Sequence, residues 1–133
     1  MTIDVLPGAE EDISHLKRTD PRALAVVLAF LEEAEADPAL IDKFASRDEA
    51  NLGKSRVSVK PWASARQKAN LFRIRILDTP ATRYRVVYGF DWHQRRIGIL
   101  AILHKDVFDY EIDSRIADRI FADWHAATDG YST

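Results

Sequence analysis

Arginine residues recur at every second position in two neighbouring segments of the chain. Residues 71–77 have the sequence Leu-Phe-Arg-Ile-Arg-Ile-Leu, and residues 83–90 have the sequence Arg-Tyr-Arg-Val-Val-Tyr-Gly-Phe. Because side chains alternate between the two faces of a β-strand, each segment places its arginines on one face and its apolar residues on the other. A guanidinium keeps its charge and binds phosphate through two parallel hydrogen bonds. The pattern therefore predicts recognition of a polyanionic ligand.

The simplest pairing of these two segments brings their charges together. A hairpin that turns at residues 79–81 sets Arg75 opposite Arg85. In the same register Ile74 lies opposite Val86, so the apolar residues fall on one face and all four arginines on the other. Like charges directly opposite one another destabilise a sheet by roughly 0.2–1 kcal/mol per pair. A bound polyanion would offset that cost. The alternative is that acidic side chains of this chain or of a partner pair with the arginines.

The basic residues are concentrated in the middle of the chain. Residues 54–98 contain 11 Lys and Arg against 2 Asp, whereas residues 1–53 contain 5 basic and 12 acidic residues. Residues 99–133 contain 3 basic and 7 acidic residues, so the net charge of the whole chain is only −2. A cationic block inside a mildly acidic protein indicates a localised anion site, and a solvated basic face is the alternative interpretation.

A group that could move protons follows the last predicted strand. His104 precedes Lys-Asp-Val-Phe-Asp-Tyr at residues 105–110, and an imidazole titrates near neutral pH. A structural histidine at a strand end is the alternative. The other histidines have no such neighbours, and we expect them at the surface: His15, His93 and His125. No metal-ligand spacing such as His-x-x-x-His is present, so we expect neither a metal nor another cofactor.

The composition is that of an ordinary globular protein. The chain has 133 residues, of which 47% are apolar and 30% charged, and it contains no cysteine. This length fits a single domain spanning residues 1–133, and the absence of cysteine excludes disulfides and thiolate metal sites. No apolar run is long enough to cross a bilayer, and the first residues lack the pattern of a signal peptide. We therefore expect a cytoplasmic protein that does not act at a membrane.

Helical periodicity dominates the first half of the chain. It predicts a short strand at residues 2–6 and an αα-hairpin over about residues 9–36, in which Asp20 caps the second helix and Pro21 begins it. Residues 38–46 could add a helical turn, and we expect a loop insertion over about residues 46–55. The apolar stripe expected on the second helix is Leu24, Val27, Leu28 and Leu31.

The second half changes to the two-residue period of β-strands. Four strands are predicted within residues 56–104, followed by a helix over about residues 112–125 on which Ile116, Ile120 and Trp124 are four apart. The expected fold is α+β with the order β-α-α-β-β-β-β-α. In it a small antiparallel sheet is packed against the αα-hairpin and the C-terminal helix.

Three segments together resemble the RelE/ParE superfamily of bacterial toxins. They are Leu-Phe-Arg-Ile-Arg at residues 71–75, Tyr-Arg-Val-Val-Tyr at residues 84–88, and the apolar strand from Ile97 to His104 ahead of a terminal helix. The resemblance covers roughly residues 54–125. It implies a RelE-like fold and a toxin of a type II toxin–antitoxin system. Such a toxin is a ribosome-dependent endoribonuclease that cleaves mRNA by attack of a ribose 2′-hydroxyl on the adjacent phosphorus.

The resemblance also implies roles for particular residues. Arg75 and Arg85 would stabilise transition-state charge, and His104 or Tyr110 would transfer protons. The family tyrosine falls on Phe108 or Tyr110, depending on the alignment. RNA-binding roles fall on four basic residues: Lys60, Arg73, Arg83 and Lys105.

The same resemblance leaves other functions open. A ParE-like toxin shares the fold and poisons DNA gyrase by protein contact, and a non-enzymatic module could dock an acidic partner on the cationic sheet. The partners that the resemblance implies for a RelE-like toxin are mRNA on the ribosome and a cognate antitoxin protein.

Overall fold

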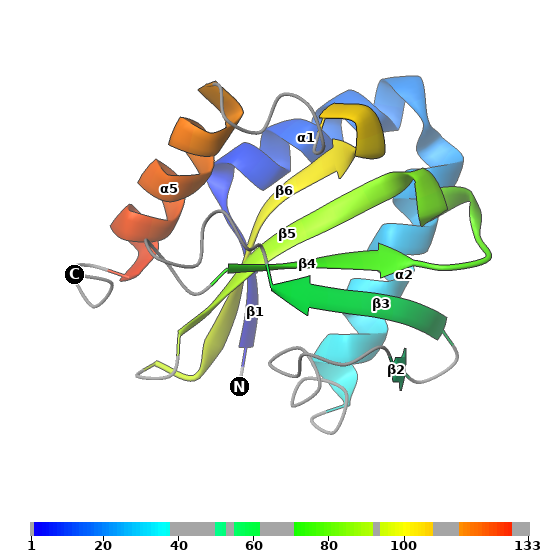
Figure 1. The fold of residues 1–133 in the computed structure, drawn as a ribbon, viewed down its shortest axis with the longest axis horizontal. Helices are drawn as coiled ribbons and strands as arrows, with labels where there is room; N and C mark the ends of the chain where they lie inside the picture. Colours follow the sequence, from blue (N-terminus) through cyan, green and yellow to red (C-terminus); the bar gives the residue numbers. More distant parts are fainter. Residues whose placement is uncertain are drawn as a thin grey trace.

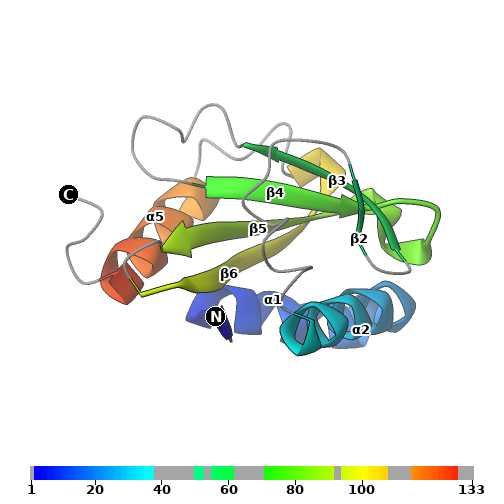
Figure 2. The same ribbon diagram turned by 90° about the horizontal axis from the view of Figure 1, so that it is seen from below.

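The structure is a computed structural model that describes residues 2–37, 50–52, 55–61, 71–91, 94–107 and 115–128. Within these residues the protein is α+β, as the sequence predicts, and six strands form one sheet in the order β1-β6-β5-β4-β3-β2. Figure 2 shows α1 and α2 side by side along one face of this sheet. The elements in chain order are β1 Thr2–Val5, α1 Pro7–Thr19, α2 Pro21–Ala36, β2 Ala50–Leu52, β3 Ser55–Pro61, β4 Leu71–Ile76, the 3-10 helix η2 Pro80–Arg83, β5 Tyr84–Asp91, β6 Arg96–His104 and α5 Arg115–Thr128 (Figure 1).

The sheet is mixed, and the prediction of a purely antiparallel sheet was wrong at one edge. Strand β1 runs parallel to β6, with Ile3 beside Ile97 and Val5 beside Ile99. Short connections join β4 to β5 and β5 to β6, and a short connection forces neighbouring strands to be antiparallel. Strands β1 and β6 are separated by 90 of the 133 residues, so connection length places no such limit on their relative direction.

The αα-hairpin forms where the sequence predicts it. Asp20 is the N-cap of α2, where its Oδ1 accepts a hydrogen bond from the amide of Ala23 at 3.3 Å, and Pro21 occupies the first turn. Leu24, Val27 and Leu31 are buried as expected, but Leu28 is 39% exposed. At 3.6 residues per turn, Leu28 falls just outside the stripe that faces the sheet.

The expected loop over residues 46–55 contains a short strand in its described part. Strand β2 pairs with β3, with Ala50 opposite Val57 and Leu52 opposite Ser55. Three residues are too few to show a two-residue period, so the sequence pattern could not reveal this strand. The helical turn considered for residues 38–46 lies outside the described residues.

The C-terminal helix α5 packs on the sheet face opposite the αα-hairpin. Its buried side chains form part of a second apolar cluster there. Ile120 and Trp124 are buried there against Leu71, Val87 and other residues of the central strands. The helix ends at Thr128, three residues beyond the predicted end, and residues 112–114 lie outside the described part. Within the described residues, no helix is long and apolar enough to span a membrane.

Candidate functional site: an arginine face on the sheet

Strands β4 and β5 divide their side chains between the two faces of the sheet as the alternation predicts. Phe72 and Ile74 of β4 pack with Val86 and Tyr88 of β5 in the core beneath the αα-hairpin. We call this side of the sheet the hairpin face. The alternate residues project to the other side, which we call the arginine face because it carries Arg73, Arg75 and Arg85.

The predicted register between the two strands is confirmed. Ile74 lies opposite Val86, and this is the last residue pair of the β4–β5 ladder. Arg75 and Arg85 are the next residues along the two strands, so they are the nearest cross-strand neighbours beyond that pair. The structure therefore places the two arginines predicted to have catalytic roles at the same end of the β4–β5 ladder.

Arg85 is held firmly against the backbone. Its side chain is largely enclosed, and the residue is only 8% exposed. Its Nη1 donates to the carbonyl oxygen of Thr82 at 3.1 Å and to that of Tyr84 at 3.3 Å. Two carbonyl acceptors on one nitrogen fix the direction of the guanidinium, because its donors lie in a rigid plane.

Arg73 and Arg75 are half-buried on β4. Arg75 has a buried Nε that, among the described residues, makes no hydrogen bond. A buried donor without an acceptor costs roughly 1–3 kcal/mol, which makes an anion with spare acceptor oxygens a favourable ligand at this position. Across the β3–β4 ladder Lys60 pairs with Arg73 and Ser58 with Arg75, which places the predicted RNA-binding Lys60 on the neighbouring strand.

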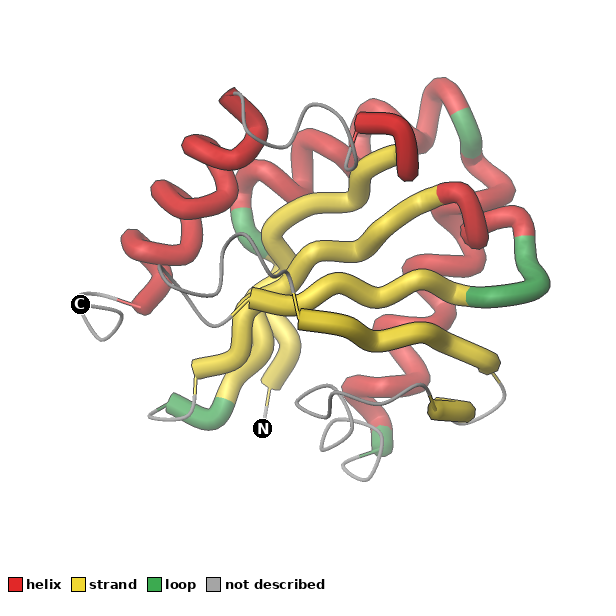
Figure 3. The backbone as a smooth tube through the Cα atoms, viewed as in Figure 1, coloured by secondary structure: helices red, strands yellow, loops and turns green. Residues whose placement is uncertain are grey.

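Arg83 is not on the sheet, and its assignment to the strand was wrong. The turn expected at residues 79–81 continues as the 3-10 helix η2, which ends with an exposed Arg83. Thr79 caps this helix by accepting a hydrogen bond from the amide of Ala81 at 3.2 Å, a local device that favours the helical turn over further strand. Strand β5 then begins at Tyr84. Figure 3 shows η2 as a red segment on the connection from β4 to β5.

His104 ends β6 as predicted, but its side chain lies on the hairpin face, away from the arginines. It pairs across the ladder with Tyr84, and the two rings meet edge to face with their centroids 5.5 Å apart. Its Nδ1 accepts a hydrogen bond from the amide of Asp106 at 3.2 Å and lies 3.6 Å from the Asp106 carboxylate.

A β-bulge explains this position. The β5–β6 register shifts between Val87 and Tyr88, and Leu100 is the extra residue on β6. Ile99 and Ile102 consequently lie in the same core, although strict alternation would place them on opposite faces. The bulge carries His104 to the hairpin face together with Ile102.

The remaining predicted residues follow β6. Lys105 is exposed in the turn after His104, whereas Phe108 and Tyr110 lie outside the described residues. The part of the chain that the structure describes contains no cluster of three His, Asp or Glu that could hold a metal ion.

The alternation in residues 83–90 predicts Tyr84 only as a residue of the apolar face. Its hydroxyl donates to Asp20 Oδ2 at 2.9 Å, which joins the sheet to the αα-hairpin. Burial raises the pKa of Tyr84 above its ordinary value of 10.0, the hydrogen bond and negative charge of Asp20 raise it further, and Arg83 lowers it. The two residues are 64 positions apart, so no local pattern could have paired them.

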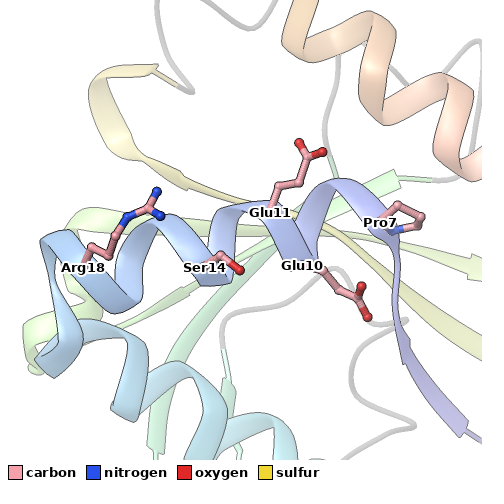
Figure 4. Close-up of a pocket in the computed structure, with 5 residues that line it drawn as sticks. All are labelled: Pro7, Glu10, Glu11, Ser14 and Arg18. Carbon is pink, nitrogen blue, oxygen red and sulfur yellow. The ribbon is translucent and has the colours of Figure 1, made fainter.

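A surface depression lies elsewhere, on the solvent side of α1. It is lined by five residues that all belong to α1: Pro7, Glu10, Glu11, Ser14 and Arg18 (Figure 4). It is open and shallow and shares no residue with the arginine face. We therefore place the candidate site on the sheet.

No protein-family model, curated protein sequence or solved structure matches this chain.

Proposed function

We propose that this protein is a RelE-like toxin of a type II toxin–antitoxin system that cleaves mRNA on the ribosome with its arginine face. The observation that carries the proposal is the placement of Arg73, Arg75 and Arg85 on one side of two adjacent strands. Three fixed positive charges at the spacing of a sheet suit the repeating phosphates of a single RNA strand.

The chemistry would be an internal transesterification. The ribose 2′-oxygen attacks the neighbouring phosphorus as its proton leaves, and the bond from phosphorus to the 5′-oxygen of the next nucleotide breaks. The products are a 2′,3′-cyclic phosphate and a 5′-hydroxyl. The pentacovalent transition state carries extra negative charge, and preorganised cations at that point usually contribute the largest catalytic effect. Arg85, already oriented by two carbonyls, and Arg75, with its unused Nε, would supply that charge.

Proton transfer would fall to residues that follow β6. Tyr110 remains the assigned candidate, with Lys105 as an exposed cation that binds a flanking phosphate. We omit His104 from the catalytic set, because its ring packs against Tyr84 on the other face of the sheet. An acidic segment of the cognate antitoxin would compete with RNA for the arginines in the cytoplasm.

The position of His104 favours a second candidate function. A cationic face from which His104 is turned away suits a binding surface as well as a nuclease. In that case the protein would act as a ParE-like gyrase poison or as a non-enzymatic module that docks an acidic partner.

The deciding experiment is expression of this protein alone in a bacterial host, with mRNA 5′ ends mapped during growth arrest. We expect cuts inside translated codons, lost in Arg85→Ala and Arg75→Ala and retained in Arg95→Ala. Arg95 is an exposed residue of the β5–β6 turn and serves as the matched control. Arrest with intact mRNA and a DNA-damage response would favour the gyrase poison. Absence of arrest would favour the binding module.

A further inference from the structure

The carboxylate of Asp20 joins two parts of the fold. Its Oδ1 caps α2 through the amide of Ala23, and its Oδ2 accepts a hydrogen bond from the hydroxyl of Tyr84 at 2.9 Å. Tyr84 is the first residue of β5. The start of this strand is therefore fixed by a side chain of the αα-hairpin.

The 3-10 helix before β5 is held from the same side. Ala81 of η2 is buried in the core beneath the hairpin, and its carbonyl oxygen accepts a hydrogen bond from the amide of Tyr84. The amide of Thr82 donates to the carbonyl oxygen of Thr79 at 3.0 Å, which closes the turn. The backbone of residues 79–84 thus forms one unit that is anchored on the hairpin face.

This unit provides two carbonyl oxygens that hold Arg85. They belong to Thr82 and Tyr84, at 3.1 and 3.3 Å from Nη1. Arg85 projects to the arginine face, whereas the anchor of the unit lies on the hairpin face. The anchor and the guanidinium therefore lie on opposite faces of the sheet and are joined through the backbone of residues 79–84.

We propose that Tyr84 is a positioning residue for Arg85: its phenol, held by Asp20, fixes the carbonyl oxygens that orient the guanidinium on the opposite face of the sheet. The effect on RNA cleavage rests on the proposed function. The orientation of the guanidinium does not, and it can be measured without any ligand.

The test compares Tyr84→Phe with Thr19→Ala in the full-length protein. Tyr84→Phe keeps the ring against His104 but removes the donor to Asp20. Thr19→Ala removes an exposed hairpin hydrogen bond to the carbonyl of His15 and leaves Asp20 and Tyr84 intact. The first measurement is nitrogen-detected NMR of the Arg85 guanidinium, which reports its rotation and hydrogen exchange. The second is kcat and KM for mRNA cleavage on ribosomes.

We expect Tyr84→Phe to accelerate guanidinium rotation and to lower kcat, each by roughly three- to tenfold, the range that corresponds to one hydrogen bond. KM should change little, because the charge of Arg85 remains available to bind RNA. Thr19→Ala should change neither quantity. If Tyr84→Phe does not fold, Asp20→Asn replaces it, because asparagine also caps a helix but removes the negative charge that holds the phenol. That variant should show a smaller change in the same direction.

Unchanged motion of the Arg85 guanidinium in the folded variant would overturn the proposal, whatever happens to cleavage. An equal change in Thr19→Ala would also overturn it, since the effect would then be a general loosening of the hairpin. Faster motion in Tyr84→Phe, with no cleavage even by the unmodified protein, would support the positioning role and reject the proposed nuclease.

Discussion

At the scale of single residues, the central strands hold charged side chains beside a buried apolar cluster. On β4, Arg73 and Arg75 follow Leu71 on the same face, and on β5 Arg85 occupies the position two residues before Val87. Leu71 and Val87 are buried under α5. Desolvation of the neighbouring guanidinium groups opposes folding, which is the pattern expected where stability is given up for binding.

The first prediction tests at Arg75 whether stability of the fold is given up for ligand binding. Replacing it with Met keeps an unbranched chain on β4 but removes a buried donor that, among the described residues, has no acceptor. We expect Arg75→Met to leave the free energy of unfolding unchanged or to raise it by about 1 kcal/mol, and to weaken RNA binding. Urea denaturation and an RNA-binding titration measure the two effects. A marked loss of stability would mean that the arginine has a structural role.

The second prediction concerns Tyr84 at alkaline pH. Its pKa in the folded protein lies above the ordinary value of 10.0. In the unfolded chain the phenol loses its proton near pH 10, whereas in the folded protein it keeps the proton to a higher pH. The stabilisation is therefore complete below about pH 10 and is lost as the pH rises through the folded pKa.

Urea denaturation across this pH range provides the measurement. The free energy of unfolding should fall less steeply with pH in Tyr84→Phe than in the unmodified protein. Tyr88, whose pKa burial raises well above its ordinary value, is present in both proteins and cancels in the comparison. Identical slopes would show that Tyr84 ionises as freely in the folded protein as in the unfolded chain.

At the scale of elements, α5 packs against the sheet through one tryptophan, whose ring lies over two glycines. Gly89 and Gly98 lie opposite each other in the β5–β6 ladder, beneath the indole of Trp124. A Cβ at Gly89 would lie 2.6 Å from Trp124 Cε2, and one at Gly98 would lie 2.7 Å from Trp124 Cζ3. Only glycine allows so close an approach between helix and sheet.

The third prediction follows from this contact. Alanine is favoured over glycine within a strand, yet Gly89→Ala should destabilise the protein by about 1–3 kcal/mol because the helix must move away. The penalty should largely disappear in a Trp124→Leu background, which removes the atoms that clash. Thermal unfolding of the four proteins in this cycle measures the coupling. Equal penalties in both backgrounds would rule out the steric explanation.

Some of these elements could be predicted from the sequence, and one feature could not. The hairpin helices, the β4–β5 register and the arginine face follow from local signals: a capping aspartate, a proline and a two-residue period. The bulge at Leu100 has no such signal, because Leu100 and its neighbours are all apolar and fit either face. For this reason the sequence could not place His104, which the bulge carries to the hairpin face.

At the scale of the whole molecule, charge is divided between the two sides of the sheet. The αα-hairpin, residues 7–36, contains seven acidic and three basic residues, and it covers one face. The opposite face carries the arginines of the cationic segment, residues 54–98. Such a separation attracts a polyanion to one side only, although the net charge is −2.

The last prediction uses the salt dependence of RNA affinity to identify the residues that attract the polyanion. Each phosphate contact on a single-stranded RNA contributes about 0.7 to the slope of log affinity against log salt concentration. Arg75→Gln should therefore weaken binding of a single-stranded RNA oligonucleotide and reduce the slope by about 0.7. Arg95→Gln removes the same charge from an exposed turn at the other end of β5 and should leave the slope unchanged. Equal effects of the two variants would indicate a general attraction by net charge. The arginine face would then not be the RNA-binding site.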